Sequence, residues 1–185
     1  MNNDEPFKLR VLHALTECIK GVTPANGYTY DLADYDADDG GSPMERVFRG
    51  RPWFGDTDPI PMVSVLEPVE EADFLFIPAV DDASGTYDWP LLVQGFVNDD
   101  PMHPTDPAYR LMRDVRRRLL AEKKRKAPGR QVLDPLGSRA FDLPNCRVNE
   151  LRVSSGKVRP ADDVSAKAYF WLVVTLNITE DGEEA

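Results

Sequence analysis

The sequence contains few of the residues on which metalloproteins and covalent enzymes rely. Its 185 residues include two cysteines and two histidines. Cys18 and Cys146 are too far apart to form a CxxC pair, so neither a zinc site nor a disulfide framework is predicted. We expect two buried thiols in a reducing cytoplasm. No HExxH, GxSxG, P-loop or helix-opening GxGxxG motif is present, which lowers the probability of an enzyme without excluding one.

Long apolar runs are also missing. The N-terminal residues include acids at Asp4 and Glu5, and no segment approaches the ~18–20 apolar residues of a membrane span. We therefore expect a soluble protein with no signal peptide and no membrane partner. The length favours one domain over residues 1–185. The 16 prolines and 12 glycines favour a loop-rich fold, with long loops at about 33–45, 68–90 and 127–145.

Charge is unevenly distributed along the chain. The net charge is −10, yet the segment from Arg110 to Arg130 holds ten basic residues and two acidic ones. This segment therefore carries +8 and the remainder −18. A basic segment on an otherwise acidic protein favours pairing between copies of the chain, basic surface to acidic surface. It argues against a free binder of duplex DNA, because the overall field opposes the approach of phosphates.

Apolar residues at helical spacing predict a first helix. Asp4 or Glu5 is the expected cap, Pro6 suits the first turn, and Pro24 marks the end. The apolar stripe of this helix comprises Phe7, Val11, Leu12, Leu15, Cys18, Ile19 and Val22.

A second helix is predicted with Asp106 as N-cap and Pro107 as its first residue, ending at Pro128 and Gly129. Its expected buried stripe is Ala108, Leu111, Met112, Val115 and Leu119, and the side chains expected to point away from it are Arg113, Arg116, Arg117 and Lys124.

Runs rich in β-branched and aromatic residues predict the strands. The expected strands are residues 28–32, 46–51, 61–67, 89–97, 146–153 and 168–179. The first two are expected to pair as a hairpin, and the last two to be antiparallel neighbours. The run Phe74–Val80 is left open between a short strand and a loop. Because strands and helices do not alternate, we predict an α+β fold, with a mainly antiparallel sheet of about five to six strands packed on two helices.

The last strand has two unlike faces. Alternation places one apolar set toward the core: Ala168, Phe170, Leu172, Val174, Leu176 and Ile178. The opposite face begins apolar at Tyr169, Trp171 and Val173 and then becomes polar. These three side chains need a cover, either a helix of the same chain or a neighbouring subunit.

The acidic loop was considered as a metal site. Asp34, Asp36, Asp38 and Glu45 match positions 1, 3, 5 and 12 of an EF-hand loop, but Asp39 occupies the position that requires glycine. A solvated acidic loop is therefore the preferred interpretation, and no metal or other cofactor is expected.

The histidines offer little more. His13 falls in the first helix, and His103 lies in a turn before the second helix without a nucleophile beside it. A role in forming the turn or the helix cap is the preferred interpretation of His103.

Four segments carry a resemblance to a known family. They are RVFRGRPWFGDTDPIPMVSVLE, WPLLVQGFVNDDP, DPAYRLMRDVRRRLL and VRPADDVSAKAYFWLVVTLNITED, together with the amphipathic N-terminal helix. With these elements in this order, the chain resembles the tail terminator, or tail completion, proteins of tailed bacteriophages. It is longer than the simplest members in the connections at 68–90 and 127–145.

The resemblance implies a structural virion protein without catalytic residues. Such a subunit forms a hexameric ring that caps the tail tube, ends its polymerisation and joins the tail to the neck. The implied partners are other copies of the chain, the tail tube protein and a neck or head-completion protein, with DNA passing through the lumen unbound. The implied location is the tail and neck of the virion, after assembly in the host cytoplasm.

Two sets of residues are expected to serve this role. The predicted subunit interface comprises Arg113, Arg116, Arg117, Lys124, Tyr169, Trp171 and Val173. The loop predicted to face the lumen or an adjacent ring comprises Asp34, Asp36, Asp38 and Asp39.

Two alternatives remain open. One is another neck ring, such as a head-completion or stopper protein. The other is a small metal-assisted or acid/base enzyme that uses Asp34, Asp36, Asp38 or His103.

Overall fold

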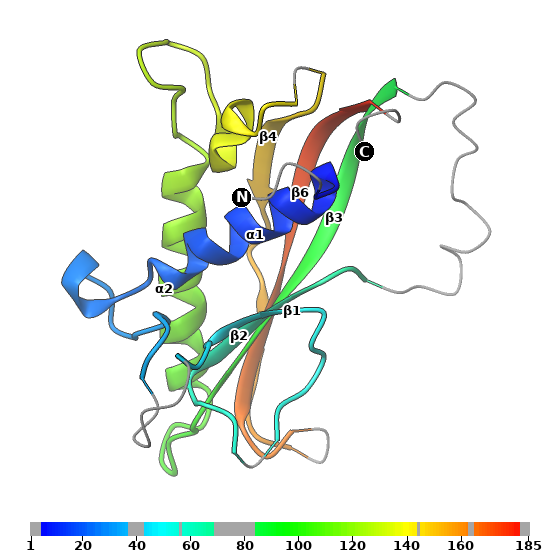
Figure 1. The fold of residues 1–185 in the computed structure, drawn as a ribbon. Coiled ribbons are helices and arrows are strands. Elements are labelled where there is room, and N and C mark those ends of the chain that lie inside the picture. Colours follow the sequence, from blue (N-terminus) through cyan, green and yellow to red (C-terminus); the bar gives the residue numbers. More distant parts are fainter. Residues whose placement is uncertain are drawn as a thin grey trace.

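A six-stranded sheet with two helices on one face forms the domain (Figure 1). This computed structural model describes residues 5–36, 43–55, 57–68, 84–143, 145–162 and 165–181. The strands are β1 (Val47–Arg49), β2 (Met62–Leu66), β3 (Ser84–Val97), β4 (Arg147–Val153), β5 (Lys157–Arg159) and β6 (Ala168–Asp181). The helices are α1 (Phe7–Lys20) and α2 (Asp106–Glu122), with short 3-10 helices η1 (Pro24–Asn26) and η2 (Pro135–Ala140).

The order in the sheet is β1-β2-β3-β6-β4, and β5 also pairs with β6. Among the strands that the structure describes, β1 and β2 run parallel and the other pairs are antiparallel. The predicted α+β class, with a mainly antiparallel sheet on two helices, is therefore confirmed.

The paired strands β3 and β6 form the centre of the sheet. Each has 14 residues, and their register runs from Ser84 opposite Asp181 to Val97 opposite Ala168. The apolar set predicted for the core face of β6 is almost completely buried. β3 begins five residues before the predicted start at Trp89, so the connection that precedes it is shorter than expected. The run Phe74–Val80 lies outside the described residues.

The predicted hairpin between residues 28–32 and 46–51 is wrong. Residues 28–32 form no strand. Their N–H groups are used elsewhere, because Thr29 and Tyr30 donate to the Asp114 carboxylate and Leu32 donates to the carbonyl of Val22. β1 pairs with β2 instead. An isolated antiparallel β-bridge between Tyr35 and Met44 closes the acidic loop.

Both helices begin without the predicted side-chain caps. Pro6 occupies the N-cap of α1, and Thr105 that of α2, with no capping hydrogen bond from either side chain. Asp106 is the first residue of α2 and not its cap. α2 ends at Glu122, before the predicted stop at Pro128, because the chain turns there into a hairpin closed by the bridge between Lys126 and Leu133.

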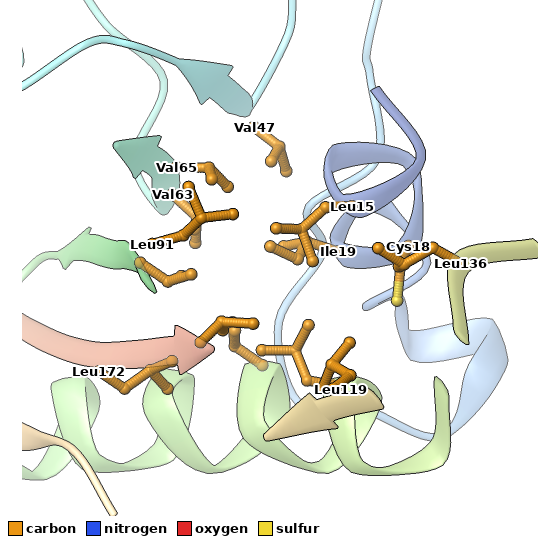
Figure 2. Close-up of a cluster of buried hydrophobic side chains, with 14 of the residues drawn as sticks. Leu15, Cys18, Ile19, Val47, Val63, Val65, Leu91, Leu119, Leu136 and Leu172 are labelled. Carbon is orange, nitrogen blue, oxygen red and sulfur yellow. The ribbon is translucent and has the colours of Figure 1, made fainter. Parts of the chain in front are cut away.

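The main core lies between the helices and the inner face of the sheet (Figure 2). Leu15 and Ile19 of α1 meet Val47, Val63 and Val65 of the first two strands. Leu119 of α2, Leu172 of β6 and Leu91 of β3 belong to the same core. The predicted stripes of both helices supply these contacts, although Leu12 and Met112 are only partly buried. Burial of this continuous apolar surface is the main stabilising term of the fold.

A smaller cluster occupies one end of the outer face. Met62, Phe96 and Tyr169 are buried there, and Phe54 packs edge-on against Phe96 with ring centroids 4.8 Å apart. No residue of either helix belongs to this cluster. Among the described residues, the cover of Tyr169 is therefore not a helix but strand neighbours and the loop that follows β1, and its contact with a second subunit stays a prediction.

Gly95 of β3 has no side chain, and the Phe170 ring occupies the space where a Cβ would lie. We predict that Gly95→Ala lowers the free energy of unfolding. Gly95 lies opposite the fully buried Phe170, and a Cβ at this position would overlap the Phe170 ring. The expected loss is about 1–3 kcal/mol, measured by urea denaturation. Gly85→Ala on the same strand is the control, because a Cβ there meets nothing within 4 Å. A Gly95→Ala variant as stable as this control would contradict the prediction.

Candidate subunit interface

Three arginines predicted to lie at a subunit boundary make contacts within their own chain. The guanidinium of Arg117 donates to the carbonyl of Gly27 and lies 4.2 Å from the centroid of the Tyr28 ring. Arg113 donates to Thr29 Oγ1 at 2.8 Å. Both arginines therefore hold the segment after η1 against α2. Their side chains are therefore not merely solvated. Their contact with another subunit stays a prediction.

The other two members of the predicted basic set differ from each other. The Nε atom of Arg116 donates to the carbonyl of Ser154 at 3.1 Å, which ties α2 to the loop after β4. Lys124 follows the end of α2 and is exposed. Lys124 is thus the residue of this set whose charge is most available to a partner.

A buried carboxylate organises the same region. Asp114 of α2 is completely buried and accepts hydrogen bonds from the N–H of Thr29 at 2.6 Å and from both Nε and a terminal nitrogen of Arg113. A buried charge is costly unless it is paired and hydrogen-bonded, and here it is both. The sequence offered no sign of this role, because Asp114 appeared as one acid in a basic run.

Two further buried acids hold the segment that follows α2. Glu122 accepts from the N–H of Leu136 at 3.0 Å and pairs with Arg125 at 3.1 Å. Asp134 accepts from Ser138 Oγ and from the N–H of Arg139. These carboxylates satisfy backbone N–H groups of η2 that would otherwise be buried without partners.

The outer face of β6 is partly open. Tyr169 lies in the small outer cluster and donates its hydroxyl to Asp162 Oδ2 at 3.2 Å. Trp171 stacks beside it, with ring centroids 5.8 Å apart, and is half-buried. Val173 is 39% exposed. Of the three aromatic and aliphatic residues predicted for an interface, Val173 is the one most clearly left for a partner.

Beyond Val173 the outer face becomes polar, as predicted. Asn177 donates to Asp88 Oδ1 at 2.9 Å, and Asp88 also pairs with Arg152. These two contacts lower the pKa of Asp88, the hydrogen bond from Asn177 first and then that from Arg152. Thr86 and Thr179 form a cross-strand hydrogen bond of 2.9 Å. This end of the face can remain in water without a cover.

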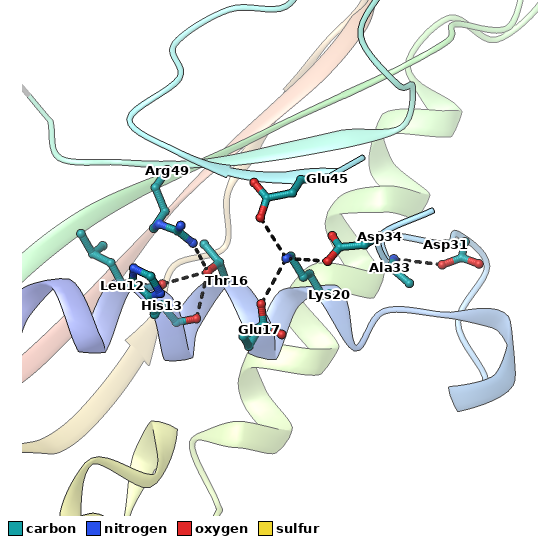
Figure 3. Close-up of polar contacts among 10 residues, drawn as sticks. All are labelled: Leu12, His13, Thr16, Glu17, Lys20, Asp31, Ala33, Asp34, Glu45 and Arg49. Atoms are coloured by element: carbon teal, nitrogen blue, oxygen red, sulfur yellow. Dashed lines mark hydrogen bonds and ion pairs between the residues drawn. The ribbon is translucent and has the colours of Figure 1, made fainter. Parts of the chain in front are cut away.

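The acidic loop is anchored by a lysine (Figure 3). The ammonium of Lys20 at the end of α1 lies 3.1 Å from Glu17, 2.9 Å from Asp34 and 3.2 Å from Glu45. Burial lowers the pKa of Lys20, but the hydrogen bonds to Asp34, Glu17 and Glu45 outweigh it and raise the pKa above its ordinary value. Asp34 therefore has a cation partner, Lys20, which is distant in sequence but adjacent in the fold.

The structure describes one other aspartate of the predicted lumen or docking loop. Asp36 is exposed, and Asp38 and Asp39 lie outside the described residues. Within the described parts of the chain, no group of three or more His, Cys, Asp or Glu residues is arranged to hold a metal ion.

The residues considered for acid/base or nucleophilic chemistry have structural contacts. The backbone of His103 forms the turn before α2, where its N–H donates to Asp100 and its carbonyl accepts from Asp106. Cys18 is buried under α2, and this burial raises the pKa of its thiol to about 12 despite the nearby charge of Arg118. In the described residues, no helix is both long and apolar enough to cross a bilayer.

Comparisons with known proteins add no relatives. No protein family model matches the chain, and no curated protein matches it significantly.

Asp114 provides a test of the contact between α2 and the segment after η1. Asp114→Ala should lower the free energy of unfolding by about 3 kcal/mol, because it leaves the N–H groups of Thr29 and Tyr30 without their acceptor. Asp106→Ala is the matched control on the same helix, since this carboxylate is half-exposed and forms a long, exposed ion pair with Arg110 at 3.6 Å. We expect a change below about 0.5 kcal/mol for the control. Equal losses in chemical denaturation would contradict the assigned role of Asp114.

Proposed function

We propose that this chain is the subunit of a ring that caps the tail tube of a bacteriophage, ends tube polymerisation and joins the tail to the neck. The observation that carries the proposal is the open, apolar centre of the outer sheet face. Val173, Trp171, Leu92 and Leu66 lie there, partly exposed, between the small outer cluster and the polar end of the face. Among the described residues, the outer cluster to which Trp171 belongs contains no residue of a helix. Leu12 of α1 lines a hollow together with Leu66 and Leu92.

The shape of the sheet supports a role in assembly. A contiguous apolar area on a soluble domain is typical of a surface that another protein covers. Here the area lies on two long, firmly paired strands, so it is a rigid surface and needs little ordering on binding. A rigid sheet face suits a permanent contact in a particle better than a transient one.

An exposed tryptophan adds to this surface. Trp53 is 75% exposed, on a loop fixed by the ion pair between Arg51 and Asp58 at 2.5 Å and by the packing of Phe54 on Phe96. Tryptophan on a fixed loop is typical of a contact with another protein, where large aromatic side chains provide much of the binding energy.

The resemblance to tail terminator proteins supplies the identity of the partners. They are other copies of the chain, six in the closed ring, the tail tube protein on one side and a neck or head-completion protein on the other. The acidic surplus fits a lumen through which DNA slides, because carboxylates repel phosphates while lysine and arginine retain them. The assembled ring belongs to the tail and neck of the virion and has no catalytic role.

Another neck ring, such as a head-completion or stopper protein, is the second candidate, since the same open face serves a ring at either position. The two candidate functions differ in the structure that the ring binds. A tail terminator stops growth of a polymerising tail tube at a defined end, whereas a head-completion protein binds the portal end of the head and leaves tube growth unchanged.

Val173→Asp tests the proposal. The residue is exposed on one side, so the variant should fold, but a charge in the open face should abolish ring formation or tube capping. The measurements are electron microscopy and sedimentation of the purified protein, alone and with tail tube protein, over a salt series.

Thr86→Asp is the control, since Thr86 lies on the same face at its polar end. It should assemble like the wild type. A wild-type chain that stays monomeric at high concentration, and that neither associates with the tube nor stops its growth, would contradict the proposal.

A further inference from the structure

A hairpin after α2 concentrates unpaired positive charge at one end of the molecule. This basic hairpin comprises residues 124–133, and its exposed cations include Lys124, Lys126 and Arg130. Across the described chain, none of these three forms an ion pair, and Lys126 donates to the neutral Gln131. The cations of α2 itself differ, because Arg113, Arg117 and Arg118 contact their own chain.

The basic hairpin also carries two exposed apolar residues on its returning arm. Val132 is 48% exposed and Leu133 is 47% exposed. This arm is held in place, because the backbone of Leu133 forms a β-bridge with that of Lys126 and the N–H of Ala127 donates to the carbonyl of Val132 at 3.0 Å. Apolar side chains held in water by a fixed backbone, and surrounded by lysine and arginine, are suited to an acidic protein surface with an apolar centre.

The root of the hairpin is rigid. The N–H of Asp134 donates to the carbonyl of Arg125 at 2.9 Å, and the buried Glu122 pairs with Arg125. The hairpin therefore projects from the end of α2 in a defined direction, as Figure 1 shows above that helix.

A complementary surface exists on the same chain. This acidic face comprises the carboxylates around the end of α1 and the start of β1: Glu17, Asp31, Asp34, Asp36 and Glu45. The cations that face them are Lys20, inside the group, and Arg46, which lies 4.3 Å from the centroid of the Tyr35 ring. Negative charge is therefore in excess. Met44, which pairs with Tyr35, is an exposed apolar residue within this face.

The two surfaces lie at different places on one chain. The basic hairpin follows the C-terminal end of α2, whereas the acidic face lies beyond the end of α1, and the two are well separated in Figure 1. Two different, complementary surfaces on identical chains form a head-to-tail contact, and repeated head-to-tail contacts generate a ring when the rotation closes.

We propose that the basic hairpin of one copy docks on the acidic face of the next copy. The proposal rests on the proposed ring and names the surfaces that join its subunits. Lys124, Lys126 and Arg130 face carboxylates of the neighbour, and Val132 and Leu133 are covered at the centre of the contact. The open outer face of the sheet is then left for the tail tube or the neck.

Charge reversal with rescue is the test. Lys124→Glu with Arg130→Glu should weaken self-association by at least about tenfold, and so should Glu17→Lys with Asp36→Lys. These acidic positions leave Asp34 and Glu45 to hold Lys20. The four substitutions combined restore charge complementarity and should return the association constant to near the wild-type value. Association is measured by sedimentation, and circular dichroism of each variant reports its fold.

Arg110→Glu with Lys167→Glu is the matched control. It changes the net charge by the same amount outside both surfaces, at the exposed Arg110 and the partly exposed Lys167, and it should leave association unchanged. A weakening as large as that of the hairpin variant would show an effect of net charge alone and overturn the proposal. Failure of the combined variant to recover would overturn the pairing of these two surfaces.

A second variant separates the apolar from the charged part of the contact. Val132→Ser with Leu133→Ser should also weaken association, whereas Leu9→Ser on the exposed side of α1 should not. If the wild type forms rings and every hairpin variant assembles equally well, the hairpin contact is wrong while the proposed ring stands. If the wild type forms no assembly under any condition, the ring and the hairpin contact both fail.

Discussion

The pairing of β3 with β6 is the constraint on which the rest of the structure depends. Fourteen residues of each strand run side by side, so the two-residue alternation of side chains is fixed over the whole height of the sheet. One face receives both helices and the residues that β6 contributes to the main core. The other face is consequently left to a small cluster and to solvent. β2 pairs with β3, and β4 and β5 pair with β6. The side chains of these strands therefore point to the same two faces of the sheet.

Local sequence patterns predicted the elements whose pattern lies within a single segment and does not depend on what that segment packs against. The alternation in β6 and the helical stripes of α1 and α2 are properties of single segments, and the structure places them as the sequence indicated. Residues 28–32 look like a strand by the same criterion, yet they form none. Their N–H groups bind Asp114, which is more than 80 residues away in sequence. No local pattern reports a partner at that separation, and the same is true of the parallel pairing of β1 with β2.

The candidate interface was harder to predict than the fold, for a related reason. A sequence gives the number of charges in a segment but not the number that remain available. Three of the four basic residues selected on α2 or after it bind backbone or side-chain groups of their own chain. The acids Asp114 and Glu122, which seemed to dilute the basic segment, are buried supports for its surroundings. The positive charge that remains available to a partner is on the basic hairpin, which begins at Lys124. This surface is recognised once the residues that bind groups of their own chain are set aside.

The two proposed contact surfaces differ in physical character, and this difference suits a subunit that must assemble in a defined order. The open outer face is apolar, so its contact loses little strength when salt rises, whereas the contact of the basic hairpin depends on charge and is screened over about 8–10 Å at physiological salt. Long-range attraction between hairpin and acidic face speeds the encounter of copies and fixes their orientation. In the proposed ring, several outer faces are presented at once, so a tail tube would be met by many apolar surfaces together, and the joint contact would be far stronger than any one of them.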